Sequence, residues 1–171
     1  MDPPAVHPAA QGEAALLADC TVRRGRRGGP GGQHRNKVET AIVIEHGPTG
    51  IRAEASERRS QEENRRSAVF RLRVNLALQV RMSIGDEYTP SDLWQSRCHN
   101  GKISVALTHR DFPAVLAEAL DVIGSEDIDV PAAAKLLGCS TSQLTKLLKT
   151  EPRALAQINA ARKTRGLHKL Q

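Results

Sequence analysis

The amino-acid sequence predicts an α+β fold, in which a small antiparallel sheet packs on a long helix and a small all-helical module follows. Two strand-like segments, residues 40–46 and 51–55, flank a Gly-Pro-Thr-Gly turn and predict a β-hairpin. Apolar side chains then recur at steps of three and four over residues 60–82, which is the spacing of one buried helix face. Over residues 113–165 the pattern is helical throughout.

The boundaries of the early elements follow from local signals. Residues 20–24 suit a short first strand that leads into a glycine-rich loop. Ser60 and Glu63 have the spacing of a capping box, in which the hydroxyl accepts from a backbone N–H and the carboxylate reaches back. The long helix should therefore begin at Ser60. Its apolar stripe consists of Val69, Leu72, Leu76 and Val80.

We expect four parts along the chain. Residues 1–19 should be a disordered tail, residues 20–82 the sheet-and-helix domain, and residues 83–110 a connector with little structure beyond a strand-like stretch at 103–107. Residues 111–171 should form the helical module, with helices over residues 113–123, 130–137, 140–149 and 152–165.

The second and third helices of this module have the spacing of a helix-turn-helix. Ala134 is a small residue that lets two helices approach, Gly138 supplies the turn, and Leu144 is a core apolar residue. Ser140 and Gln143 repeat the capping-box spacing. Two interpretations stay open: a bundle whose spacing reflects packing alone, or a surface that contacts nucleic acid.

The charge distribution favours a polyanionic partner. The chain has a net charge of +6 and a pI near 9.7. Residues 20–38 contain no acid, whereas residues 111–134 contain six acids and no base. We therefore expect an oriented contact in which the acidic block faces away from the phosphates. The chain has four aromatic residues, too few for a base-stacking platform, so binding should depend on charge and shape.

Other classes of protein fit the sequence poorly. No apolar run approaches the ~18 residues of a membrane span, so no membrane partner is expected. Three cysteines without framework spacing favour reduced thiols and a cytoplasmic location. No cofactor or metal is expected, because the conceivable zinc ligands lack a standard spacing. These are Cys98, His99, His109 and Cys139.

The most informative segment is the glycine-rich run at residues 28–37. Consecutive glycines let the backbone approach a ligand closely, and exposed N–H groups there can hold a phosphate or stabilise an oxyanion. The run lacks the lysine followed by Ser or Thr of a nucleotide-binding loop. Basic side chains surround it and favour RNA as the ligand: Arg23, Arg24, Arg26, Arg27, Arg35 and Lys37.

Residues 27–34, with the sequence RGGPGGQH, resemble the GGQ loop of bacterial class I peptide chain release factors. The resemblance continues through Asn36-Lys37, the hairpin sequence HGPTGI at residues 46–51, and Arg59-Ser60-Gln61 with Asn64. It covers residues 20–82, which it identifies as a GGQ catalytic domain.

The resemblance implies hydrolysis of the ester that links a peptide to P-site tRNA, with the peptidyl transferase centre and large-subunit rRNA as partners. Gln33 would supply a backbone N–H and position water, while Gly31 and Gly32 permit tight entry. No side-chain nucleophile is implied, and His34 as general base is the alternative to its contacting RNA. The expected RNA contacts are Arg23, Arg24, Arg26, Arg27, His34, Arg35, Lys37, Arg59, Lys146, Lys149, Arg162, Lys163 and Arg165.

A stop-codon reader of this kind has a recognition domain before the catalytic one, whereas 19 residues precede Cys20. We therefore expect codon-independent release on stalled ribosomes, as in the stand-alone GGQ proteins. Those anchor through a long basic tail, which the helical module replaces here. Release on dissociated large subunits, and a non-catalytic RNA- or DNA-binding regulator, are the alternatives. We expect a monomer, and a methyltransferase acting on Gln33 is a further candidate partner.

Overall fold

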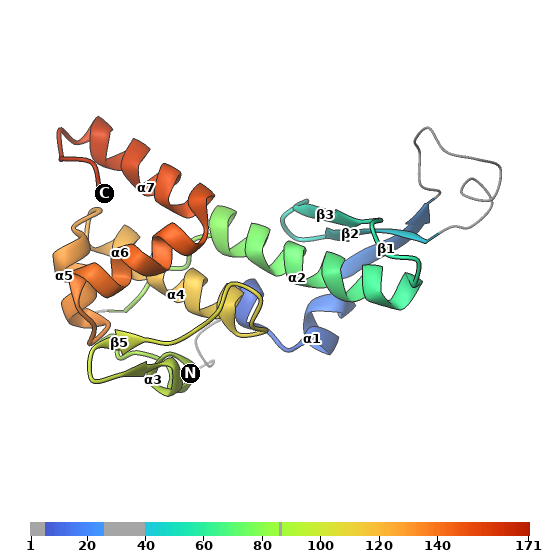
Figure 1. The fold of residues 1–171 in the computed structure, drawn as a ribbon, viewed down its shortest axis with the longest axis horizontal. Coiled ribbons are helices and arrows are strands. Elements are labelled where there is room, and N and C mark those ends of the chain that lie inside the picture. Colours follow the sequence, from blue (N-terminus) through green and yellow to red (C-terminus); the bar gives the residue numbers. More distant parts are fainter. Residues whose placement is uncertain (1–5, 26–39, 86) are drawn as a thin grey trace. The chain divides into compact units, whose positions relative to one another are not determined.

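The computed structural model describes residues 6–25, 40–85 and 87–171 (Figure 1). The chain divides into two compact units, Met1–Leu76 and Ala77–Gln171, which we call unit 1 and unit 2. Unit 1 is mixed and unit 2 is mainly helical, so the predicted α+β class is confirmed.

Unit 1 is built on a three-stranded antiparallel sheet in the order β1-β2-β3. The strands are β1 (Cys20–Gly25), β2 (Ala41–His46) and β3 (Arg52–Ala55), close to the predicted bounds. Helix α2 (Gln61–Gln79) runs alongside the sheet (Figure 1). The buried side chains alternate along β2 and β3 and recur at helical spacing on α2, so these faces form one core. They include Ile42, Ile44, Ala53, Ala55, Ala68, Val69, Leu72 and Leu76.

The conformation of the turn between β2 and β3 requires several residues of the sequence HGPTG. Gly50 has φ +68°, which favours glycine. The Gly47 N–H donates to the Asp19 carbonyl at 2.8 Å, and a Cβ on Gly47 would lie 3.1 Å from that oxygen. His46 is buried, with Nδ1 2.8 Å from the Thr49 hydroxyl. Backbone conformation, close approach and hydrogen bonding therefore give this motif a structural role.

The segment before β1 is folded where we expected a disordered tail. It contains a 3-10 helix, η1 (Pro8–Ala10), and a short helix, α1 (Glu13–Ala18). Ala9 and Leu16 are fully buried, and the Arg73 side chain of α2 donates to the Ala9 carbonyl at 2.9 Å. The prediction was wrong because these few apolar residues gain their burial from tertiary contacts and not from a local pattern.

Unit 2 is organised around helix α4 (Phe112–Ser125), whose residues from Phe112 to Ala117 and from Ala119 to Ile123 are all buried. Around it lie α5 (Val130–Leu136), α6 (Thr141–Thr150) and α7 (Pro152–Thr164). The four predicted helices are confirmed with bounds that differ by at most two residues.

The expected connector is also folded, as part of unit 2. It forms helix α3 (Asp92–Arg97) and a hairpin of β4 (Cys98–His99) and β5 (Lys102–Ile103). Trp94 is 1% exposed, and its indole N–H donates to the Leu137 carbonyl at 2.7 Å. Of the strand expected at 103–107, only Ile103 pairs. These elements are too short for a periodic signal and are stabilised by the helices they pack on.

A buried carboxyl gives unit 2 a pH dependence. Asp121 is 6% exposed, its Oδ1 accepts from the Met82 N–H at 3.0 Å, and Arg81 lies 3.9 Å away. Burial raises the pKa of Asp121 from 3.8 to about 6. The folded state therefore binds this proton more tightly than the unfolded state, and stability is lost as the pH rises from about 4 through about 6.

We predict that Asp121→Asn, which keeps the acceptor oxygen but cannot ionise, becomes more stable relative to the unmodified protein as the pH rises. The difference in their free energies of unfolding should change by roughly 2 to 3 kcal/mol between pH 4 and pH 7. Urea denaturation monitored at the two pH values measures it, with Asp129→Asn as the control for losing a carboxylate at an exposed helix cap. A constant difference would contradict this assignment.

Candidate functional site

The predicted catalytic residues Gly31, Gly32 and Gln33 lie outside the described residues, as do Arg26, Arg27, His34, Arg35 and Lys37. The structure describes the frame that carries this segment. Gly25, the last residue of β1, pairs with Ala41, the first residue of β2. The segment that bears the glycines thus departs from and returns to neighbouring points at one end of the sheet.

Asn64 is the central residue of this frame. It is fully buried at the start of α2, and its side-chain amide donates to the carbonyls of Thr40 at 2.7 Å and Arg58 at 3.0 Å. Its Oδ1 accepts from the Arg58 N–H at 2.9 Å. Thr40 is the residue at which the chain returns to the sheet. One side chain thus joins the end of the loop, the β3–α2 connection and the helix.

The β3–α2 connection is held at two further points. The Ser60 hydroxyl accepts from the Glu63 N–H at 3.3 Å, which confirms the serine half of the predicted capping box. On the next turns of α2, Arg71 donates to the Glu54 carbonyl at 2.7 Å and forms an ion pair with Glu57. The hydrogen bond from Arg71 lowers the pKa of Glu57 to about 2. These contacts fix the backbone on which Arg58 and Asn64 meet.

Three of the predicted RNA contacts lie on this frame. Arg23 and Arg24 are exposed on β1, the edge strand that runs into the loop, and Arg59 is exposed just before α2. None of the three makes an ion pair with the described part of the chain.

The predicted contacts in unit 2 separate into two groups. Arg162 donates to the carbonyls of His168 at 2.7 Å and Ile128 at 3.0 Å, and Arg165 pairs with Asp127 at 2.8 Å. These two arginines hold the α4–α5 turn and the C-terminal segment, so their first role is structural. The others are exposed lysines without an ion pair among the described residues: Lys146, Lys149 and Lys163.

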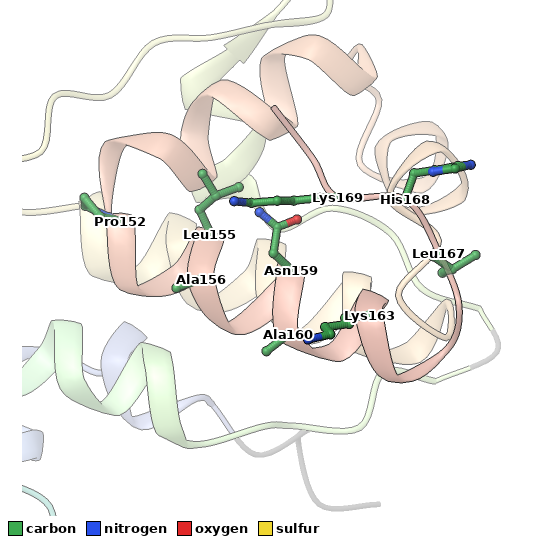
Figure 2. A pocket seen from close by; sticks show the side chains of 9 residues that line it. All are labelled: Pro152, Leu155, Ala156, Asn159, Ala160, Lys163, Leu167, His168 and Lys169. Carbon is green, nitrogen blue, oxygen red and sulfur yellow. The ribbon is translucent and has the colours of Figure 1, made fainter.

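Lys163 lies on a groove of about 690 Å³ between α7 and the C-terminal segment (Figure 2). Leu155, Ala156 and Leu167 contribute apolar surface, and Lys169 is also on the lining. The segment is held in place by Asn159, whose amide donates to and accepts from the Leu170 backbone at 3.2 and 2.7 Å. This groove is a separate surface from α6, which carries Lys146 and Lys149.

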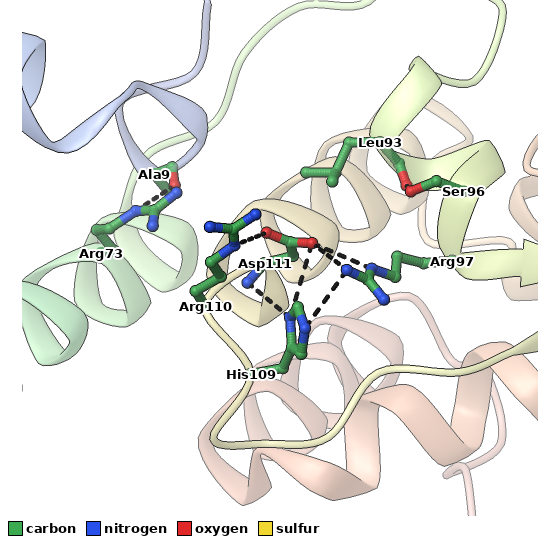
Figure 3. Close-up of polar contacts among 8 residues, drawn as sticks. All are labelled: Ala9, Arg73, Leu93, Ser96, Arg97, His109, Arg110 and Asp111. Carbon is green, nitrogen blue, oxygen red and sulfur yellow. Dashed lines mark hydrogen bonds and ion pairs between the residues drawn. The ribbon is translucent and has the colours of Figure 1, made fainter.

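Most acids of residues 111–134 accept hydrogen bonds within unit 2, which charge counting could not reveal, although only Asp121 is buried and Asp127 and Asp129 are exposed. Asp111 is the centre of a cluster in which Arg97 donates to it at 2.6 Å, with Arg110 and His109 3.6 and 3.7 Å away (Figure 3). Glu118 accepts from the Tyr88 hydroxyl at 2.6 Å and the Ser91 N–H at 2.7 Å. These acids, together with Asp121, Asp127 and Asp129, serve as acceptors within unit 2.

No three His, Cys, Asp or Glu side chains come together as metal ligands in the part of the chain that the structure describes. Cys98 and Cys139 are free thiols, and burial raises the pKa of both, that of Cys139 to about 12. Among the described residues, no helix has the length and apolarity to cross a membrane.

Comparison with known proteins identifies the family to which this chain belongs. The model of the RF-1 domain matches residues 17–104, just over half of the chain, and the chain belongs to that family. The match begins three residues before β1 and ends just after β5, so it includes α2, α3 and the short hairpin.

The chain is also similar to individual release factors. Peptide chain release factor 1 of Chlorobaculum tepidum is 38% identical over 96 residues, 56% of this chain and 26% of that protein. Chloroplastic peptide chain release factor PrfB1 of Arabidopsis thaliana is 39% identical over 79 residues, 46% of this chain and 16% of that protein. The matched region thus spans about a quarter or less of these relatives.

Asn64 provides a test of the frame. Asn64→Ala leaves the Thr40 carbonyl and both Arg58 backbone groups without their partner, and should lower the free energy of unfolding by roughly 2 to 3 kcal/mol. Denaturation in urea measures this loss.

The matched control is Asn75→Ala, which removes another α2 amide that donates to a strand carbonyl, Arg52, at 2.9 Å. This position lies three turns further along α2. A loss at Asn64 no larger than at Asn75 would contradict the central role of Asn64.

Proposed function

We propose that this protein releases peptides on the ribosome by hydrolysing the peptidyl-tRNA ester without reading a stop codon. The observation that carries the proposal is the sequence Gly31-Gly32-Gln33 within an RF-1 domain, between strand ends that pair at Gly25 and Ala41. Proteins named peptide chain release factors are 38 to 48% identical to this chain over 59 to 96 residues.

The chemistry assigned to the loop needs no side-chain nucleophile. Attack of water on the ester carbonyl places negative charge on its oxygen, and a preorganised N–H stabilises that charge. The Gln33 backbone N–H takes this role and its side chain positions the water, while Gly31 and Gly32 allow close approach of the backbone. Loss of one such donor typically raises a barrier by about 3 to 4 kcal/mol.

The frame supports this chemistry through positioning. A loop that enters a narrow site gains from a base that does not shift, because misplaced groups lose much of their effect on the rate. Asn64 fixes Thr40, at the return of the loop, to the connection before α2. Arg23, Arg24 and Arg59 surround that base with positive charge, which suits entry into rRNA.

Independence from a stop codon is supported by the helical module. Residues 105–171 follow the RF-1 match, and the structure folds them into helices that carry exposed lysines with no ion pair to any residue the structure describes. Such a surface offers a ribosome contact that does not depend on the mRNA sequence. Release on isolated large subunits is the second outcome to be measured.

The deciding experiment compares two substitutions at Gln33. Gln33→Pro has no N–H and should reduce the rate of peptide release by at least a hundredfold, since an oxyanion donor is lost. Gln33→Ala keeps the N–H and should retain part of the activity. Release of labelled peptide from P-site tRNA measures both, and equal rates for Gln33→Pro and the unmodified protein would contradict the mechanism.

The same assay identifies the ribosomal target. We expect release from ribosomes stalled on truncated mRNA, with no requirement for a stop codon in the A site. Isolated large subunits carrying peptidyl-tRNA form the parallel reaction. Activity confined to stop-codon complexes would overturn the codon-independent proposal. Activity confined to isolated large subunits would identify those subunits as the target in place of stalled ribosomes.

A further inference from the structure

Arginine and lysine have different roles in unit 2. Its arginines are occupied within the fold: Arg97 with Asp111, Arg153 with Glu151, and Arg165 with Asp127, while Arg81 and Arg162 donate to backbone carbonyls. The lysines form no ion pair with the described residues. They are Lys102, Lys135, Lys146, Lys149, Lys163 and Lys169, and all are exposed.

Helix α6 concentrates this unpaired charge on one face. Ser142, Lys146 and Lys149 are exposed and follow each other at steps of four and three, so they share one side of the helix. Leu144, Leu147 and Leu148 are buried on the other side. We call Ser142, Lys146 and Lys149 the α6 face.

The turn that presents this helix is held on several sides. Gly138 has φ +66°, and the indole of Trp94 donates to the Leu137 carbonyl at 2.7 Å. The Ser140 hydroxyl accepts from the Gln143 N–H at 3.2 Å, while the Gln143 side chain accepts from the Ile103 N–H at 3.3 Å. Only the serine half of the predicted capping box forms, because the Gln143 side chain accepts from β5 instead of reaching back to the Ser140 N–H. The α6 face is therefore preorganised for a ligand.

The segment that carries this face is strongly basic. From Val130 to Gln171 the chain has eight Lys and Arg residues and a single acid, Glu151. Glu151 is 7% exposed and its carboxylate pairs with Arg153 at 2.8 Å. Five of the six acids that precede α5 accept hydrogen bonds within the unit, namely Asp111, Glu118, Asp121, Asp127 and Asp129.

We propose that the α6 face binds the phosphate backbone of double-helical RNA. The choice of RNA over DNA depends on the proposed function at the ribosome. Trp94 and Phe112 are buried and cannot stack on bases, so recognition is by charge and shape. The major groove of A-form RNA is too narrow to be read by side chains, so α6 contacts phosphates and ribose from the minor-groove side.

The test uses the full chain and a 16-base-pair RNA hairpin, with binding followed by fluorescence anisotropy at increasing KCl. The double variant Lys146→Gln/Lys149→Gln should bind roughly tenfold more weakly at 0.1 M salt. The negative slope of log affinity against log salt should become smaller in magnitude by about 2. Lys163→Gln with Lys169→Gln, on the groove of Figure 2, removes the same charge from outside the α6 face and should change both values clearly less than the α6 pair does.

Equal effects of the two pairs, or no effect of the α6 pair, would overturn the proposal. So would equally tight binding of a DNA hairpin of the same sequence with the same lysine dependence. Thermal melting shows whether the variants fold. Peptide release by the unmodified protein, measured separately, tests the proposed function: its absence would leave the hairpin result standing as a property of α6.

Discussion

A single buried amide determines how the loop-bearing part of unit 1 is assembled. An amide removed from water is costly unless its donors and acceptor find partners. Asn64 finds all of them in backbone groups of Thr40 and Arg58. The end of the loop and the start of the helix are therefore satisfied by the same side chain, and neither can move away without leaving polar groups unpaired inside the core.

The division between the two basic residue types has a physical reason. The planar guanidinium presents several donors in a fixed geometry, which suits carboxylates and clustered carbonyls within a fold. Arg97, Arg162 and Arg165 use it in that way. A lysine ammonium is a hydrated point charge on a flexible chain, and it remains available at the surface. The arginines named here thus stabilise unit 2, and its lysines contribute exposed positive charge.

The boundary of the sequence family differs from the boundary of the structural units. The RF-1 match extends to residue 104, whereas unit 2 begins at Ala77. The matched elements α3 and β5 bond directly to the turn of the helix-turn-helix, through Trp94 to Leu137 and through Ile103 to Gln143. The helical module is consequently anchored on residues of the RF-1 region and is not an independent appendage.

The sheet, the long helix, the four later helices and the GGQ motif could all be predicted from the amino-acid sequence, because each depends on local periodicity, caps or a contiguous motif. Other features depend on tertiary contacts. The folding of residues 8–18 and of α3 depends on contacts with distant elements, which no short window contains. The same holds for charge. Only the fold shows that Arg162 and Arg165 are bound within unit 2 whereas Lys146 and Lys149 form no ion pair with the described residues, because ion pairing depends on partners far away in the sequence.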